Sequence, residues 1–161
     1  MNKTQSLSLF VVALLTLGSC TKFDDGPALS LLPAKARLTG EWELVDFSGQ
    51  DAADYLEELQ EGASMSMEFD RDGEGDLILT SPQYDYYFDY QTYQYTQVLV
   101  GTTTDFYNIE WDLDEEELEM QLYQNGEFED FSLWEITRLT NSELEMTPKY
   151  YPVITYIFEK N

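Results

Sequence analysis

Residues 107–113, Tyr-Asn-Ile-Glu-Trp-Asp-Leu, place an apolar side chain at every second position, with Asn or an acidic residue between them. Successive side chains of a strand point to opposite faces of a sheet, so this period buries one face and exposes the other. The same alternation occurs at residues 65–69 and 118–122. It is typical of antiparallel sheets with one solvated face. The sequence therefore predicts an all-β protein.

Short turn segments separate the strand-like runs. Asp72-Gly73 and Asn125-Gly126 are dipeptides that tight hairpins favour, because both central positions accept positive φ. Asn141-Ser142 separates two further runs in the same way. The remaining runs are residues 77–79, 84–90, 93–100, 136–139, 144–146 and 154–158. Regular short strands joined by turns indicate a sandwich or a barrel, here with about eight to ten strands.

Residues 51–62 interrupt the strand pattern. Ala52, Leu56 and Leu59 lie at spacings of four and three, which place them on one stripe of a helix. Asp51 can cap the start of this helix, and Gly62 can end it. We expect one short helix between the first two strands. No internal repeat or linker follows residue 40, so we expect a single folded domain.

Three motifs resemble a known group of proteins in their order and spacing. They are Arg37-Leu-Thr-Gly-Glu-Trp42, Phe69-Asp-Arg-Asp-Gly73 and Trp134-Glu-Ile-Thr-Arg-Leu-Thr140. Together they resemble lipocalins and their calycin relatives, and the lipocalin-like domains of Bacteroidetes lipoproteins. The resemblance implies a single antiparallel up-and-down β-barrel over residues 37–161.

The same resemblance implies structural roles for three residues. In such barrels a Gly-x-Trp motif opens the first strand, which here is Gly40 and Trp42. The tryptophan closes the base, and an arginine from a late strand lies across its indole. Arg138 matches that position. The cation–π contact would contribute about 0.5–2 kcal/mol when it is partly desolvated.

The first twenty residues resemble a lipoprotein leader. Lys3 precedes an apolar stretch over residues 7–17, which is too short for a membrane-spanning helix but suits a secretory signal. Leu17-Gly-Ser-Cys20 resembles the bacterial lipobox, in which the cysteine becomes the lipidated N-terminus. We expect a signal peptide at 1–19 and a lipidated tether at 20–36. The alternative is an ordinary secretory peptide cut near Ser19.

The residues after Cys20 indicate a location. Lys22 and Asp24-Asp25 resemble the signals that carry Bacteroidetes lipoproteins to the outer face of the outer membrane. We therefore expect a lipid-anchored protein of the cell outer membrane that faces the cell surface. Cys20 is the only cysteine, so a disulfide within the chain is excluded.

The charge balance excludes one class of partner. The chain has 32 acidic and 8 basic residues, and its formal net charge is −24. Such a surface repels phosphate backbones, so we expect no nucleic-acid binding. It also keeps copies apart in solution, and we expect a monomer.

The sequence offers little for catalysis or metal binding. It has no histidine, which excludes Ser-His-Asp machinery and histidine metal ligands. Carboxylate pairs such as Asp85 with Asp89 arise by chance in so acidic a chain. The loop Asp70–Asp76 resembles a calcium loop, but Ser81 stands where a bidentate acid is needed. We expect no enzyme activity, no cofactor and no metal site.

Two groups of residues are candidates for ligand binding. One is the sulfur-containing pair Met65 and Met67, which shares a strand face. The other is a tyrosine-rich segment, because tyrosine suits pockets that are part apolar and part wet. Its members are Tyr84, Tyr86, Tyr87, Tyr90, Tyr93 and Tyr95.

Two hypotheses of function follow. In the first, the barrel holds a small, partly apolar ligand, which requires a cavity of about 300–1,000 Å³. In the second, the barrel is filled by its own side chains, and an exposed Tyr/Asp face binds a glycan or another envelope protein.

The leader generates a direct test. We expect Cys20→Ala to abolish acyl labelling and detergent partitioning, because the thiol is the lipid attachment point, while the domain from Arg37 onward still folds. Metabolic labelling with a fatty-acid analogue measures this. An unacylated wild-type protein that begins at another residue would contradict the prediction.

Overall fold

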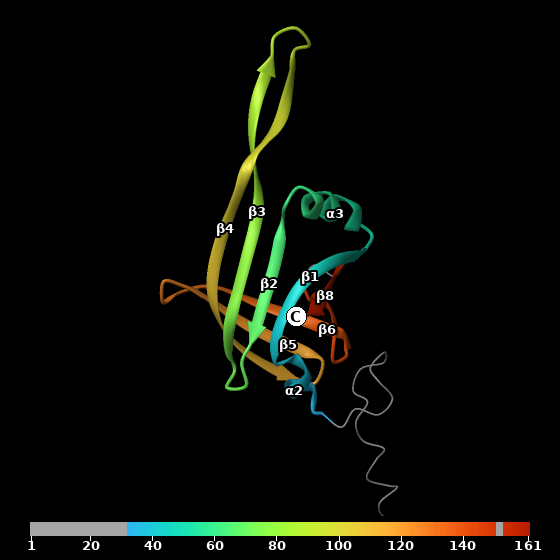
Figure 1. The fold of residues 1–161 in the computed structure, drawn as a ribbon, viewed down its shortest axis with the longest axis vertical. Coiled ribbons are helices and arrows are strands. Elements are labelled where there is room, and N and C mark those ends of the chain that lie inside the picture. Colours follow the sequence, from blue (N-terminus) through green and yellow to red (C-terminus); the bar gives the residue numbers. More distant parts are fainter. Residues whose placement is uncertain (1–31, 151–152) are drawn as a thin grey trace, which may run out of the picture.

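Eight antiparallel strands close into a barrel in the computed structural model, which describes residues 32–150 and 153–161 (Figure 1). The strands are β1 (Gly40–Gly49), β2 (Ser64–Phe69), β3 (Glu74–Asp89), β4 (Gln94–Asp114), β5 (Glu117–Gln124), β6 (Glu127–Leu139), β7 (Glu143–Pro148) and β8 (Ile154–Lys160). Each strand pairs with the next in sequence, and β8 returns to pair with β1. The predicted up-and-down barrel is confirmed.

The strand count lies at the lower end of the prediction because two strands are unusually long. β3 joins the runs at 77–79 and 84–90 up to Asp89, across a register shift between Gln83 and Tyr84. β4 likewise contains both 94–100 and 107–113. Continuous pairing between β3 and β4 carries the chain through the segments that separate these runs in sequence.

Within the described residues, two helices lie at opposite ends of the barrel (Figure 1). The first, α3 (Ala52–Gln60), follows β1 and confirms the predicted helix. The second, α2 (Ala34–Leu38), was not predicted and begins inside the expected tether. Its last two residues, Arg37 and Leu38, are buried, so the end of α2 packs into the folded domain. No helix in the described ranges has the length and apolar content to cross a membrane.

The hairpin turns follow the sequence signals. Asn125 and Gly126 both have positive φ, at 54° and 82°, as a two-residue turn between β5 and β6 requires. Gly73 has a φ of 96° in the turn between β2 and β3. The segment Asp70–Asp76 therefore forms a hairpin turn at Asp70–Gly73 and the start of β3.

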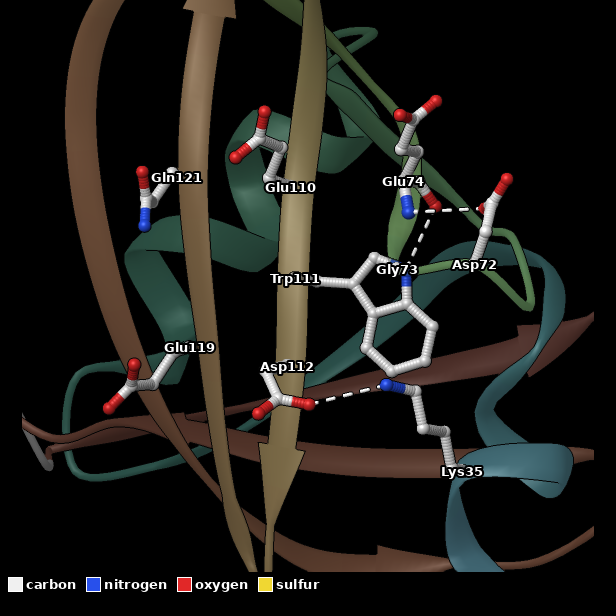
Figure 2. A pocket seen from close by; sticks show the side chains of 9 residues that line it. All are labelled: Lys35, Asp72, Gly73, Glu74, Glu110, Trp111, Asp112, Glu119 and Gln121. Atoms are coloured by element: carbon white, nitrogen blue, oxygen red, sulfur yellow. Dashed lines mark hydrogen bonds and ion pairs between the residues drawn. The ribbon is translucent and has the colours of Figure 1, made fainter.

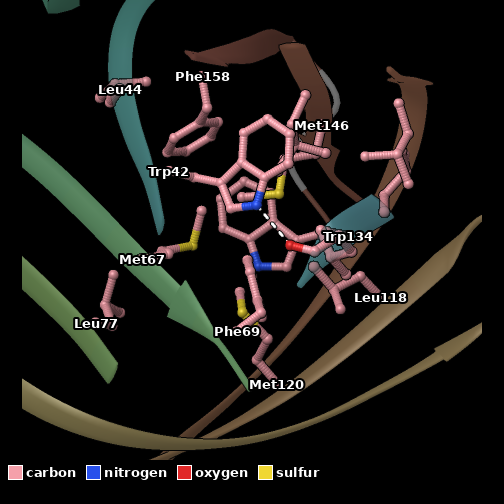
Figure 3. Packing of buried hydrophobic residues seen from close by; sticks show 14 of the residues in the cluster. Trp42, Leu44, Met67, Phe69, Leu77, Leu118, Met120, Trp134, Met146 and Phe158 are labelled. Carbon is pink, nitrogen blue, oxygen red and sulfur yellow. Dashed lines mark hydrogen bonds between the residues drawn. The ribbon is translucent and has the colours of Figure 1, made fainter. Parts of the chain in front are cut away.

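Trp42 lies among the buried side chains at the end of the barrel beside α2, which we call the closed end (Figure 3). Its side chain has no exposed surface, and its indole Nε1 donates a hydrogen bond of 2.6 Å to the carbonyl oxygen of Leu38. Met67, its cross-strand partner on β2, is also buried, and Phe158 and Met146 lie beside it in Figure 3. Trp42 is therefore enclosed by β1, β2, β8 and α2 at this end of the barrel.

The cation over Trp42 is Lys160, and the prediction of Arg138 in that place is wrong. Lys160 Nζ lies 4.9 Å from the centroid of the Trp42 ring. It also donates hydrogen bonds to the carbonyl oxygens of Arg37, at 2.9 Å, and Thr39, at 2.6 Å. Because Lys160 pairs with Trp42 across β1 and β8, the last strand supplies the cation that holds α2 against the base.

A register shift explains where Arg138 lies instead. Without it, Arg138 would share the inner face with Ile136, two residues earlier. The shift between Ile136 and Arg138 makes Glu145 the partner of Arg138, and Glu145 lies between two inward-facing residues of β7. Arg138 therefore points outward, where its guanidinium pairs with Glu143 at 3.1 Å and Glu145 at 4.0 Å.

Gly40 is required at the start of β1. Its φ of 124° lies in a region that residues with a Cβ rarely adopt. A Cβ there would also lie 2.7 Å from Lys160 Cε. Both observations indicate that a side chain at position 40 would strain the start of β1.

Truncation of Trp42 should be costly. We expect Trp42→Ala to lower the free energy of unfolding by about 3–5 kcal/mol, because it leaves a large cavity in the closed end. Chemical denaturation measures the loss. Val45→Ala on the same strand is the control, since Val45 is 43% exposed and should change stability by no more than about 0.5 kcal/mol. Equal effects of the two substitutions would contradict the assignment.

Candidate functional site

An apolar pocket opens at the end of the barrel that α3 covers. Its volume is about 210 Å³, and it is open to solvent. Four strands and the helix contribute its walls. The principal lining residues are Leu44, Phe47, Leu59, Met65, Leu79 and Tyr156. We call this the mouth pocket.

Ring contacts hold α3 over the mouth pocket. Phe47 lies 5.5 Å from the ring of Tyr55, on α3, and 4.9 Å from the ring of Tyr156, on β8, between centroids. Leu56 and Leu59 of α3 pack against the core, as the helical stripe predicts. A helix of this length depends on such packing for its stability. The roof of the pocket is therefore built from the apolar face of α3.

The barrel core forms the floor of the mouth pocket. Leu44 and Phe47 belong to the buried core, and Met65, Leu79 and Tyr156 pack directly against it. The resulting volume is below the usual range of about 300–1,000 Å³ for ligand sites. The pocket therefore fits a smaller ligand than the sequence hypothesis assumed.

The two methionines of the candidate site have different environments. Met65 lines the mouth pocket and is partly exposed. Met67 is 2% exposed and lies in the core beside Trp42. Of this pair, only Met65 lies where a ligand can reach it.

Carboxylates surround one side of the pocket entrance. A second open pocket, of about 370 Å³, lies between α3 and the base of the β3–β4 hairpin. Tyr84, Gln97 and Leu99 form its hairpin side. Its acidic side is Asp54, Glu57, Glu58 and Glu61. We call this the acidic pocket.

Tyr84 connects the hairpin to the end of α3. Its hydroxyl donates a hydrogen bond to Glu61 Oε2. That bond, with smaller contributions from burial and from the charges of Glu61, Glu58 and Glu57, raises the pKa of Tyr84 to about 12. The tyrosine therefore stays protonated and acts as a donor throughout the physiological pH range.

The β3–β4 hairpin extends well beyond the rest of the barrel (Figure 1). β2 stops pairing with β3 at Thr80, and β5 begins pairing with β4 at Asn108. Between these points, residues 81–89 and 94–103 pair with each other and with no third described strand. Each strand of the hairpin therefore has one free edge.

The tyrosines of the candidate site lie on this hairpin, beyond the part of β3 and β4 that pairs with β2 and β5. Tyr84 is partly exposed and lies beside α3. The others are exposed to solvent, namely Tyr86, Tyr87, Tyr90, Tyr93 and Tyr95. None of these six tyrosines lines the mouth pocket with Met65, although Ser81, at the start of the hairpin, does.

The hairpin tip is ordered by its own side chains. Phe88 lies 5.0 Å from the rings of Tyr90 and Tyr95, between centroids. The Asp89 carboxylate accepts hydrogen bonds from the Gln91 amide, at 2.8 Å, and the Thr92 hydroxyl, at 2.9 Å. These bonds lower the pKa of Asp89. Asp89 therefore stabilises the turn, and its carboxylate is already engaged.

A third open pocket, of about 420 Å³, lies on the outer wall near α2 (Figure 2). Lys35 Nζ lies 4.8 Å from the centroid of the Trp111 ring and 3.2 Å from Asp112 Oδ1. Trp111 Nε1 donates a hydrogen bond to the carbonyl oxygen of Glu74. These contacts attach α2 to β4, which explains the pocket as a structural junction.

The described part of the chain contains no group of three or more His, Cys, Asp or Glu side chains placed to hold a metal ion. Cys20 lies outside the described residues, as do the signal peptide and most of the expected tether.

No protein-family model and no curated protein matches the sequence. Among solved structures, the chain is similar to a lipocalin-like protein from Bacteroides uniformis ATCC 8492, with 18% sequence identity and a TM-score of 0.45. The match covers 78% of this chain and 99% of that one. The barrel assignment rests on the strand pairing of the chain itself.

Proposed function

We propose that the protein is a non-catalytic, lipid-anchored binding protein of the cell envelope that holds a small apolar group in the mouth pocket. The observation that carries the proposal is the apolar lining of that pocket beneath α3. The lipobox-like sequence at residues 17–20 supports the anchor. The acidic run that follows it supports a location on the outer membrane, facing outward.

The pocket sets the size of the ligand. A volume of about 210 Å³ accommodates a short aliphatic chain or one small ring. Because the pocket is open to solvent, the rest of a longer molecule can extend out past α3. Burial of the apolar part supplies affinity, at roughly 25 cal/mol per Å² removed from water before the costs of association.

Methyl NMR tests this proposal. We expect n-hexanol to shift the methyl resonance of Met65, which lines the mouth pocket, and to leave that of Met146, which is fully buried, unchanged. Leu59→Trp fills the pocket from the α3 side and should abolish the shift. Equal shifts at both methionines, or an unchanged response in the variant, would contradict binding in the mouth pocket.

The exposed hairpin favours a second function, contact with another macromolecule of the envelope. Tyr90 and Tyr93 are each 80% exposed at its tip. Residues 90–104 carry no charge and no proline, although a quarter of the chain is charged. Natural proteins usually protect free strand edges with charges or proline, so this edge suits an extended polypeptide of a partner protein.

A substitution on the hairpin tests the second function. We expect Tyr87→Ala to lower binding of the labelled protein to envelope proteins at least severalfold, because exposed aromatic rings dominate such contacts. Tyr150→Ala is the matched control, since Tyr150 is exposed but lies outside the hairpin. Binding to a glycan array that depends on Tyr87 would instead assign the hairpin to sugars. Unchanged binding on both would remove the hairpin as a contact surface.

A further inference from the structure

The mouth pocket and the acidic pocket share a wall. Glu58 of α3 lines both of them. One pocket is apolar, and the other carries the carboxylates of the exposed side of α3. A molecule with its apolar part beneath Leu59 therefore has its polar end close to Glu58.

The charge at this entrance has one sign. The acidic pocket has four carboxylates on its α3 side, and no basic residue lines either pocket. The described basic residues that form ion pairs do so elsewhere. Lys35 pairs with Asp112, Arg138 with Glu143, and Lys149 with Glu117. Among the described residues, none with a positive charge lines either pocket, so no lining side chain offsets the negative charge at the mouth.

The field of Glu58 reaches into the mouth pocket. Tyr156 lines that pocket, and burial, together with the nearby Tyr55 and Glu58, raises the pKa of Tyr156. The carboxylate therefore acts on groups at the wall of the apolar cavity. An anion placed there would meet the same repulsion, and a cation would be stabilised.

We propose that the ligand is an amphipathic amine, with a short apolar chain in the mouth pocket and its ammonium group at the acidic pocket beside Glu58. The inference rests on the proposed function and names its ligand class. Fatty acids and other anionic amphiphiles are disfavoured, because their carboxylate would lie against the carboxylates of α3. Because the two pockets share Glu58, one small molecule can contact the apolar lining and the carboxylates at the same time.

Three probes with the same six-carbon chain separate charge from apolar burial. They are n-hexylamine, protonated at neutral pH, uncharged n-hexanol, and anionic hexanoate. We expect n-hexylamine to bind about tenfold more tightly than hexanoate, with hexanol between them. Each exposed carboxylate of the acidic pocket attracts an ammonium group and repels a carboxylate only weakly, and several together give a difference of this size. The difference should shrink at an ionic strength of about 1 M, where the Debye length is roughly 3 Å. The Met65 methyl resonance reports binding of all three.

Substitution of Glu58 tests the location of the ammonium group. We expect Glu58→Gln to weaken n-hexylamine severalfold and to leave n-hexanol unchanged. Glu119→Gln is the matched control, because it removes one exposed carboxylate from β5, at the pocket near α2. Equal weakening of n-hexylamine binding by both variants would show that affinity depends on the net charge of the protein, and it would overturn the assignment to Glu58.

The outcomes distinguish the two proposals. If n-hexanol binds at Met65 and the three probes have equal affinity, the proposed binding in the mouth pocket is supported and the amine inference fails. If hexanoate binds most tightly, the amine inference also fails. If none of the probes shifts Met65, the proposed function fails and the inference fails with it.

Discussion

Closure of the barrel depends on β1, which pairs with β2 along one edge and with β8 along the other. Trp42 lies at this seam, and Lys160, its partner on β8, covers the ring and donates to two carbonyls at the end of α2. A lysine near the end of a helix stabilises carbonyls that have no partner within the helix. One side chain therefore joins the first strand, the last strand and the preceding helix.

A solid base leaves the opposite end for binding. Trp42, Met67 and Phe158 fill the barrel near α2, so the remaining apolar space lies beneath α3. The roof there is a short helix held by ring contacts to Phe47, rather than a strand in the hydrogen-bonded wall. Elements with little buried surface are the ones that open most readily. The rigid end and the accessible end of the barrel thus follow from where the large side chains are placed.

Local patterns in the sequence predict most of this fold, because alternation and turn dipeptides act over a few residues. They predict the strands, and the helical spacing of Ala52, Leu56 and Leu59 predicts α3. The expected place of Trp42 comes instead from the resemblance of its Gly-x-Trp motif. Local patterns do not predict Arg138, because the register shift after Ile136 comes from pairing with β7 and reverses the face of the side chain. They do not predict the projecting hairpin for a similar reason, because the length of β3 and β4 beyond their neighbours is a property of the whole sheet. Of the candidate ligand residues, Met65 alone lines the mouth pocket.

The distribution of charge limits where contacts can form on this protein. A net charge of −24 favours solvation over most of the surface. Binding surfaces must therefore be places that lack charged side chains, or places where the carboxylates themselves attract a ligand. The mouth pocket and the uncharged segment 90–104 are two such places, and Gln97 and Leu99 of that segment lie beside α3. The hydrogen bond between Tyr84 and Glu61 connects them, because it attaches the hairpin to the helix that covers the pocket. Glu61, which lines the acidic pocket, is therefore already engaged by the hairpin.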